Sequence, residues 1–430
     1  MRLLAVSGFN KVGGNMFYIE DEKKKEGYIF DMGIDVEMAL FHKDKPLSLM
    51  SKEEAIKKQI IPDDSLVPKQ KVRKIIVSHA HYDHVAAVPL LERDYNAFIV
   101  SSPFTIEVLK KLSNDRRERI KNKMIKVEPN NKFQNVEMVK VNHSIPQACA
   151  AVVETSEGKF VYMQDFKIDN HSMFGKINLK RFKEIGQEGV KVLMIESLYS
   201  DHSGYSPSER VAKTMVEDVI EKEQDNFLIL TTYSSHIERI KTMVDTLKKY
   251  GKEPLILGRS MEKFVKTAQD HKIAEIDAPV YYNPKDVANI LKEVDREKHA
   301  LIVTGNQGEQ GSLLDRLAND HYPHFKIEKE DVVIFSSTVI PSPINMSMRA
   351  LLEQKLTKKG ARVIKDVHVS GHAYREEIRK MIRILNPEYI IPGHQDIRKR
   401  SVLASLAAEE GYIVGKDVLL LNEKEFKRIV

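Results

Sequence analysis

The sequence predicts an α/β protein in which a strand-rich region is followed by an inserted layer of alternating strands and helices. Between Leu3 and Ala150 the apolar residues form short runs and alternations that are broken by turns, which is typical of β-strands. From about Ser206 to Leu356 strand and helix patterns alternate, which indicates a parallel α/β layer. Such patterns continue to the carboxyl terminus, where histidines appear again. A chain of 430 residues has the length of two or three domains.

The strands expected in the first region are local apolar runs that end at turn residues. The tetrapeptide Ser156-Glu157-Gly158-Lys159 separates two such runs and predicts a hairpin. The expected strands cover residues 16–19, 27–30, 74–77, 136–141, 150–155, 160–165 and 190–195.

The inserted layer is expected to begin with a helix. Ser206 is a candidate N-cap, Pro207 suits the first turn, and Glu209 stands at the third helical position. The layer then continues with strands at 227–230, 255–257, 300–303 and 332–335 and helices at 236–250 and 261–269. The closing region predicts strands at 361–364, 389–391 and 418–421 and helices at 375–385 and 397–410.

Composition indicates a folded cytoplasmic protein and excludes several other classes. The 68 Lys and Arg residues exceed the 62 Asp and Glu residues by six, so the charge permits an anionic partner without establishing one. Cys149 is the only cysteine, which excludes an intrachain disulfide and a cysteine-rich zinc site. The sequence has no run of about 18 apolar residues and no signal peptide pattern, so we expect no membrane partner.

The segment His79-Ala80-His81-Tyr82-Asp83-His84 follows the expected strand at 74–77 and carries metal-ligand chemistry. Alternation at a strand end places His79 and His81 on one side, while the following turn redirects Asp83 and His84. One loop can thus supply two metal ions. Imidazole and carboxylate ligands suit zinc, manganese or iron, and the lack of thiolates favours a catalytic over a structural site.

This segment resembles the metal loop of the metallo-β-lactamase superfamily. His143, Asp165 and His394 follow in the order of that family's next histidine, its bridging aspartate and its last ligand. The resemblance implies an αββα sandwich that holds two divalent metal ions, with zinc expected and manganese as the alternative. It assigns to one ion His79, His81 and His143, to the other Asp83, His84 and His394, and to both Asp165.

The insert and the tail resemble the β-CASP branch of the superfamily and, within it, ribonuclease J. Glu196, His372 and His394 match the acidic and histidine motifs of the branch, and residues 258–261, 304–309 and 368–373 resemble ribonuclease J. The implied organisation is a metallo-β-lactamase domain at 1–205 and 357–430 with a Rossmann-like β-CASP domain at 206–356. The chain departs from the family pattern at Ala80, Tyr82, Asn306 and 395–398, and its length is like that of the shorter archaeal forms.

The resemblance implies a 5′-to-3′ exoribonuclease that acts on 5′-monophosphorylated single-stranded RNA, with possible endonuclease activity, in RNA processing and decay. A homodimer is expected by the same likeness. Asp83 would accept a proton from the attacking water, and His372, oriented by Glu196, would protonate the leaving oxygen. His368 would steady the phosphate or else be a core histidine.

A terminal phosphate needs fixed donors, and several candidates lie at strand ends or glycine-flanked turns. They are Arg259, Asn306, Ser336, Ser337 and Ser370, and ordinary turn or cap roles are the alternative. Asp31 and Asn15 are expected to support the metal loop from outside. Tyr233 and His236 could contact RNA, whereas Ser234 or Ser235 could instead cap the next helix.

Three other functions remain as alternatives. The first is a β-CASP endoribonuclease like the cleavage factor of mRNA 3′ ends, against which stand the 368–372 run and the absence of amino-terminal KH-like sequence. A metabolite hydrolase of the glyoxalase or lactamase kind would not explain an insert of about 150 residues. A non-catalytic scaffold subunit typically loses ligands, whereas here all seven positions are filled.

Overall fold

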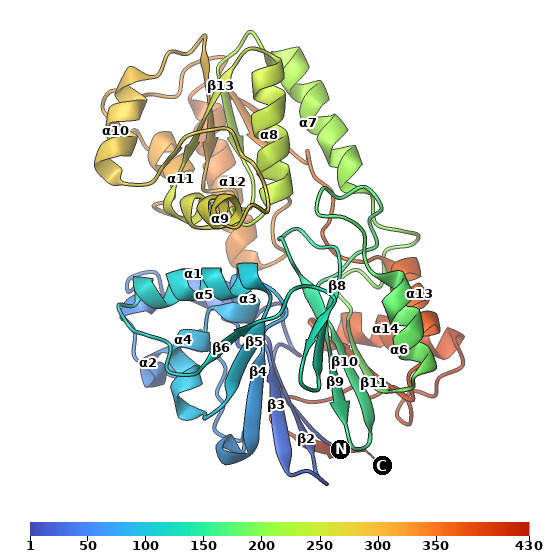
Figure 1. The fold of residues 1–430 in the computed structure, drawn as a ribbon. Coiled ribbons are helices and arrows are strands. Elements are labelled where there is room, and N and C mark those ends of the chain that lie inside the picture. The colour runs from blue at the N-terminus through green and yellow to red at the C-terminus, as the bar shows by residue number, and fades with distance from the viewer. Residues whose placement is uncertain (430) are drawn as a thin grey trace. The chain divides into compact units, whose positions relative to one another are not determined.

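The computed structural model describes residues 1–429, which form two compact units (Figure 1). Within the described residues, the first unit comprises 1–170, 175–206 and 370–429, and the second comprises 171–174 and 207–369. The domain boundaries expected at 205/206 and 356/357 stay predictions. By packing, however, strand β17 (Arg362–Ile364) pairs with β16 (Val332–Phe335), so residues just beyond 356 lie in the second unit.

The first unit contains two β-sheets. One has the order β19-β1-β2-β3-β4-β5-β6, antiparallel from β19 to β3 and parallel from β3 to β6. The other has the order β18-β11-β10-β9-β8-β7, and the expected hairpin joins β9 and β10. The strands are β1 (Arg2–Ser7), β2 (Met16–Asp21), β3 (Glu26–Phe30), β4 (Val72–Ile76), β5 (Phe98–Ser101), β6 (Met124–Lys126), β7 (Asn131–Phe133), β8 (Val136–Lys140), β9 (Cys149–Thr155), β10 (Gly158–Met163), β11 (Val190–Glu196), β18 (Tyr389–Gly393) and β19 (Phe426–Arg428).

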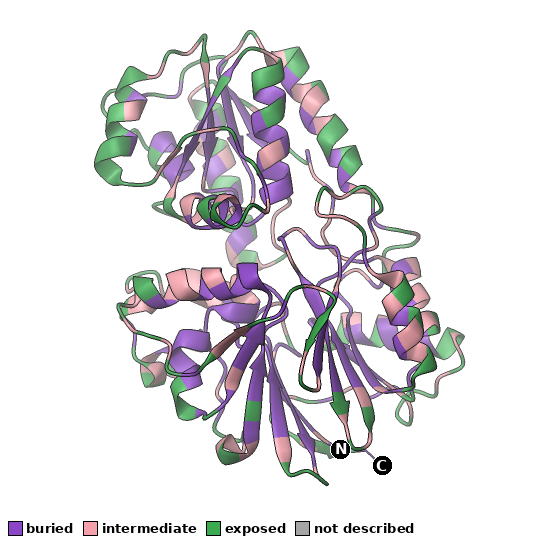
Figure 2. Cartoon of the chain, in the orientation of Figure 1, coloured by how far each residue is buried: buried purple, intermediate pink, exposed green. Residues whose placement is uncertain are grey.

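The two sheets face each other across an apolar core, and helices cover their outer faces. Phe30 of the first sheet stacks on Tyr162 of the second, with ring centroids 4.9 Å apart. Burial is concentrated along the strands, as Figure 2 shows. The helical segments are α1 (Val36–Phe41), η1 (Leu47–Leu49), α2 (Lys52–Lys57), η2 (Lys69–Lys71), α3 (Tyr82–Val85), α4 (Val88–Leu91), η3 (Glu92–Asp94) and α5 (Pro103–Asp115) beside the first sheet, and α6 (Leu179–Gln187), α13 (Arg375–Leu385) and α14 (Ile397–Glu409) beside the second. This arrangement is the αββα sandwich that the resemblance implied.

The second unit is a parallel sheet between helices. Its strand order is β14-β13-β15-β12-β16-β17, and neighbouring strands in this order pair in parallel. The other strands are β12 (Leu228–Thr231), β13 (Glu253–Leu257), β14 (Val280–Tyr281) and β15 (His299–Val303), and the helices are α7 (Glu209–Glu223), α8 (Ile237–Lys249), α9 (Arg259–Asp270), α10 (Pro284–Glu293), α11 (Leu313–Ala318) and α12 (Pro343–Lys358). The expected Rossmann-like layer is therefore present, and the fold class is confirmed.

Two local expectations were wrong. The first helix of the insert begins at Glu209 and is capped by Ser208, because Ser206 instead donates a hydrogen bond to Glu377 at 2.9 Å. The strand expected at 418–421 is reduced to isolated bridges at Val418, since that residue pairs singly with Ile390 of β18. Across residues 1–429 there is also no helix with the length and apolar character needed to cross a bilayer.

A buried ion pair stabilises the second unit. Arg239 is fully buried, and its Nε and Nη2 donate to the two carboxylate oxygens of Glu209 at 2.6 and 2.8 Å. We expect Arg239→Ala to lower the free energy of unfolding by about 3–5 kcal/mol, because it leaves a buried carboxylate without its partner. Urea unfolding followed by circular dichroism measures this change.

The matched control is Lys241→Ala on the same helix. Lys241 pairs with Asp245, whose side chain is 54% exposed, so its loss should cost less than about 1 kcal/mol. An Arg239→Ala variant as stable as this control would contradict the structural importance of the buried pair.

Candidate metal centre

The metal loop is positioned by the end of β4 and by the short helix α3. His79 is buried, His81 is the N-cap residue of α3, and the helix itself carries Asp83 and His84. The turn after β3 is bound to this helix by hydrogen bonds that the backbone amides of Met32 and Ile34 donate. Gly33 is required there, because a Cβ at this position would lie 1.6 Å from the Asp83 carbonyl oxygen. The loop is therefore fixed by the backbone before any ligand binds.

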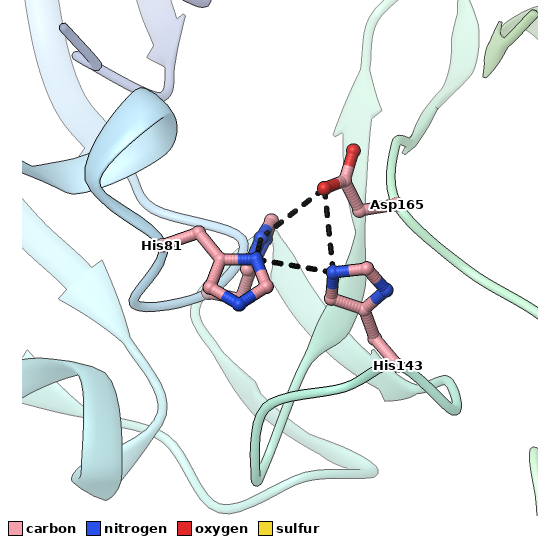
Figure 3. Close-up of side chains that lie close together, drawn as sticks. His81, His143 and Asp165 are labelled. Atoms are coloured by element: carbon pink, nitrogen blue, oxygen red, sulfur yellow. Dashed lines mark hydrogen bonds and ion pairs between the residues drawn. The ribbon is translucent and has the colours of Figure 1, made fainter. Parts of the chain in front are cut away.

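Four side chains from three separate segments meet in the first ligand group, which consists of His79, His81, His143 and Asp165. The Nδ1 atom of His81 lies 3.1 Å from the Nε2 atoms of both His79 and His143. The Oδ2 atom of Asp165 lies 3.4 Å from Nε2 of His143 (Figure 3). His143 follows β8 and Asp165 follows β10 of the second sheet, whereas His79 and His81 follow β4 of the first, so strand ends of both sheets bring these side chains to one point.

A second group shares the same aspartate and consists of Asp83, His84, Asp165 and His394. Oδ1 of Asp165 lies 3.2 Å from Nε2 of His394, which follows β18. Asp165 and His394 have φ angles of 41° and 59°, in the left-handed region that non-glycine residues seldom adopt. Strained backbone of this kind clusters at functional sites, where the surrounding structure enforces it.

The donor set fits divalent metal ions. Oδ1 of Asp165 is buried and, among the described residues, has no hydrogen-bond partner. Burial and the neighbouring His79 hold the pKa of His81 well below its ordinary value, so this imidazole is neutral. Burial opposes ionisation of Asp165, but His394 and His84 outweigh it and hold the pKa of Asp165 well below its usual range. Neutral imidazoles and ionised carboxylates are the forms that bind metal.

The surroundings of His84 also carry negative charge that a metal ion could balance. Burial lowers its pKa, but Asp165, Asp83 and Asp31 together raise it well above the ordinary value. Three carboxylates around one buried imidazole favour a positive charge at this point. A divalent cation would supply that charge in place of the proton.

Side chains outside the cluster orient the ligands. Asp31 accepts hydrogen bonds from Nδ1 of His84 at 2.7 Å and from the Tyr162 hydroxyl at 2.8 Å. Oδ1 of Asn15 lies 3.0 Å from Nδ1 of His394. Both residues thus support the ligands from outside, as expected. The role of Tyr162 was missed, because it sits in an ordinary apolar strand pattern.

His372 lies beside the metal cluster and is paired with a buried carboxylate. Its Nδ1 atom is 2.7 Å from Oε2 of Glu196, and its ring centroid is 4.9 Å from that of His143. The other oxygen of Glu196 accepts a hydrogen bond from the Phe166 backbone amide at 2.8 Å. Burial lowers the pKa of His372, but Glu196 and Asp165 overcome this effect and raise it to about 9.

The backbone that carries His372 is held by two residues on neighbouring loops. Lys167 donates from Nζ to the Ser370 carbonyl at 2.9 Å, and Nδ1 of His143 lies 2.8 Å from the Gly371 carbonyl oxygen. A Cβ on Gly371 would lie 3.2 Å from that same His143 nitrogen. Lys167 was missed by sequence reasoning, although its position two residues after Asp165 is the signal that could have singled it out.

The expected phosphate-binding residues fall in both units. In the second unit Arg259 begins α9 after β13, Asn306 follows β15, and Ser337 follows β16. They therefore share the carboxyl edge of a parallel sheet, where such folds bind ligands. Nδ2 of Asn306 and Oγ of Ser337 are buried without a hydrogen-bond partner in the described part of the chain. Ser370 lies in the first unit, where its hydroxyl accepts the His372 amide at 3.0 Å.

Ser336 and His368 belong to the network around Arg239. The Ser336 hydroxyl donates to the Val367 carbonyl at 2.6 Å and accepts from Arg239 Nη1 at 2.7 Å. The hydroxyl proton of Ser336 is thus engaged within the second unit, and the expected phosphate contact of Ser336 stays a prediction. Nδ1 of His368 lies 3.4 Å from the same Arg239 nitrogen.

The residue that caps α8 differs from the one expected. His236, rather than Ser234 or Ser235, is the N-cap of α8, and its Nδ1 accepts from the Arg239 amide at 3.3 Å. The Tyr233 hydroxyl donates to the Thr338 carbonyl at 2.7 Å. Both side chains thus have structural partners within the second unit.

Three family models match the chain. The model described as "Metallo-beta-lactamase superfamily" matches residues 10–121, and "Ribonuclease J, beta-CASP domain" matches 225–351. The model described as "Zn-dependent metallo-hydrolase RNA specificity domain" matches 358–420. Together with the sandwich and the histidine and aspartate cluster, these matches define a metal-dependent hydrolase of the β-CASP branch of the metallo-β-lactamase superfamily.

Two proteins with similar sequences show which family within this class the chain belongs to. The chain is 37% identical to Ribonuclease J of Methanocaldococcus jannaschii over 100% of both chains. It is 39% identical to Ribonuclease J of Pyrococcus abyssi over 98% of this chain and 95% of the relative. The chain belongs to the ribonuclease J family, and it is a metal-dependent ribonuclease.

The fold recurs in a solved structure. A crystal structure of a protein of unknown function from Enterococcus faecalis matches with a TM-score of 0.64 over 99% of both chains. Its sequence identity is 16%, so this similarity concerns the fold alone.

Proposed function

We propose that this protein is a two-metal 5′-to-3′ exoribonuclease that acts on 5′-monophosphorylated single-stranded RNA, with some internal cleavage, in cytoplasmic RNA processing and decay. The observation that carries the proposal is Asp165, whose carboxylate contacts both ligand groups: Oδ2 lies 3.4 Å from His143 and 3.5 Å from His84, and Oδ1 lies 3.2 Å from His394. Such a shared carboxylate suits a pair of metal ions acting on one phosphodiester. Family membership supports RNA as the substrate.

The ligand roles follow from the two groups. His79, His81 and His143 would hold one ion, Asp83, His84 and His394 the other, and Asp165 both. Bound there, the ions would lower the pKa of water and stabilise negative charge on the phosphate. Zinc is the proposed metal because nitrogen ligands dominate, and manganese is the alternative.

Asp83 is placed to accept the proton of the attacking water. Its side chain is 19% exposed, whereas His84 beside it is fully buried, so water reaches the carboxylate. Burial raises its pKa, but His84 outweighs this effect and lowers the pKa, so Asp83 is ionised and carries no proton of its own.

His372 is the proposed proton donor to the leaving oxygen. The Glu196 carboxylate accepts from Nδ1 and favours the protonated ring, which leaves Nε2–H to donate. Lys167 and His143 hold the loop and thereby fix where this proton is presented.

A 5′-phosphate would be bound by donors that the fold leaves without partners. Asn306 and Ser337 are the two such donors among the expected residues. Arg259, Ser370 and His368 are further candidates because of their positions in the sequence. Ser336 also stays a candidate, and its hydrogen bond to Val367 fixes the backbone next to His368. A homodimer is proposed as well, and light scattering coupled to size-exclusion chromatography tests it.

The decisive test is product analysis with RNA strands that differ only at the 5′ end. We expect mononucleotides to be released fastest from 5′-monophosphorylated RNA, more slowly from 5′-triphosphorylated or 5′-hydroxyl RNA, and not at all by His81→Ala. Metal is added in each case and products are resolved by gel electrophoresis. Discrete internal fragments that are indifferent to the 5′ end would instead favour an endonuclease of the mRNA 3′-end cleavage type.

A further inference from the structure

Three aromatic rings lie next to one another and form a cluster in the first unit. Tyr199 follows β11, His202 lies three residues further on, and Tyr374 is the N-cap residue of α13. The ring centroids of Tyr199 and His202 are 4.7 Å apart, those of His202 and Tyr374 are 5.0 Å apart, and those of Tyr199 and Tyr374 are 5.7 Å apart. None of these residues is a metal ligand or a proton donor in the proposed chemistry.

Backbone hydrogen bonds hold the cluster in place. Tyr199 and Tyr374 form an isolated parallel bridge, and the His202 amide donates to the Tyr199 carbonyl at 3.0 Å. The Arg375 amide in turn donates to the His202 carbonyl at 3.0 Å. A ligand that packed on these rings would therefore meet a preorganised surface and lose little affinity to ordering it.

The cluster is partly open to solvent. The His202 side chain is 45% exposed, and Tyr199 and Tyr374 are partly buried. The rings therefore keep aromatic surface that a planar ligand could cover. Aromatic surface of this kind binds the bases of single-stranded nucleic acid, since every base has a face that can stack.

The cluster is also continuous with the catalytic site. The ring centroid of Tyr199 lies 6.1 Å from that of His372, and the ring centroid of His372 lies 6.0 Å from that of the ligand His394. A nucleotide whose phosphate lies beside His372 would thus carry its base within reach of Tyr199.

We propose that Tyr199, His202 and Tyr374 form a stacking platform for a base next to the scissile bond of the RNA strand. This inference rests on the proposed function, because it takes RNA as the strand at the metal centre. Stacking would tolerate any base and would position the strand relative to His372. The platform therefore determines how well RNA binds and contributes less to the rate of the bound complex.

The first test separates KM from kcat. Tyr199→Leu keeps apolar volume but removes the ring, and we expect KM for 5′-monophosphorylated RNA to rise about tenfold or more, with a smaller change in kcat. An RNA that lacks the base next to the scissile bond should show no such difference between wild type and variant. Tyr205→Leu is the matched control, because Tyr205 is a nearby tyrosine in the sequence whose side chain is 61% exposed and which is not one of the three rings of the cluster.

The second test does not depend on catalysis. RNA that carries the fluorescent base 2-aminopurine next to the scissile position is added to full-length protein kept in chelator. Stacking on the platform should quench the fluorescence with wild type, much less with Tyr199→Leu, and again with Tyr199→Phe, which retains the ring. Thermal unfolding of each variant confirms that it is folded.

The two proposals can fail separately. Equal KM values and equal quenching for wild type and Tyr199→Leu would overturn the platform, even if wild type degrades RNA from its 5′ end. Wild type that quenches 2-aminopurine through Tyr199 but shows no 5′-end preference would overturn the exonuclease proposal and support the platform.

Discussion

Asp165→Asn is expected to lower kcat for RNA cleavage by at least about 10³-fold, a loss of about 4 kcal/mol of transition-state stabilisation. The substitution keeps the shape of the side chain but removes its charge. Both ligand groups use this carboxylate, and its Oδ1 is buried with no other hydrogen-bond partner in the described structure. Metal ions typically contribute several kcal/mol to such reactions, so damage to two sites at once should be severe.

Two measurements check this expectation. Steady-state kinetics on 5′-monophosphorylated RNA give kcat, and metal analysis of the purified protein gives the ions bound per chain, which should fall in the variant. Asp44→Asn is the matched control, because that carboxylate is 74% exposed and lies outside both ligand groups. A variant at position 165 that keeps its metal and loses less than tenfold in kcat would contradict the shared-ligand assignment.

His372→Gln is expected to lower kcat by about 10²- to 10⁴-fold, the usual contribution of a general acid. Glutamine can still donate a hydrogen bond but cannot give up a proton. Glu196→Gln should give a smaller loss in the same direction, because His372 would remain while the carboxylate that favours its protonated form would be gone. Neither change removes a residue of the two main ligand groups around Asp165.

A substrate with sulfur in place of the leaving oxygen distinguishes proton donation from a purely structural role. Sulfur leaves without protonation, so His372→Gln should cleave this substrate at close to the wild-type rate. His324→Gln, at an exposed histidine of the second unit, is the control. If the loss at position 372 were the same for the oxygen and the sulfur substrates, His372 would not be the proton donor.

Much of the fold and the ligand set could be predicted from local sequence. The strands at 16–19 and 74–77 could be predicted because a short apolar run that ends at a turn is compatible with few structures other than a buried strand. The loop from His79 to His84 was visible because ligand chemistry depends on residue type, and four ligating side chains stand within six positions. Asp165 and His394 also follow strands directly, where a fold can bring side chains together.

The sequence could not predict which of two chemically similar neighbouring residues forms a given contact. Ser206 and Ser208 are both good helix caps, and Ser208 fills that role because Glu377, 171 residues away from Ser206, takes the hydroxyl of Ser206. The same limit applies to Ser336, because its local sequence does not show that the Val367 carbonyl accepts its hydroxyl proton. Local residue preferences do not decide such contacts, because the residues that compete for them become neighbours only when the chain is folded.

The sequence by itself thus determined the strand-rich region, the inserted parallel layer and the ligand chemistry of the segment from His79 to His84, because each depends on local patterns of residue type. The αββα sandwich and the other expected ligands followed from the resemblance to a known family. Only the tertiary structure decided how the loop that carries His372 is held. Lys167 reaches the carbonyl of Ser370 from 203 residues away, and His143 reaches that of Gly371 from 228 residues away. Contacts of this range leave no local pattern, because they depend on the packing of whole sheets and loops.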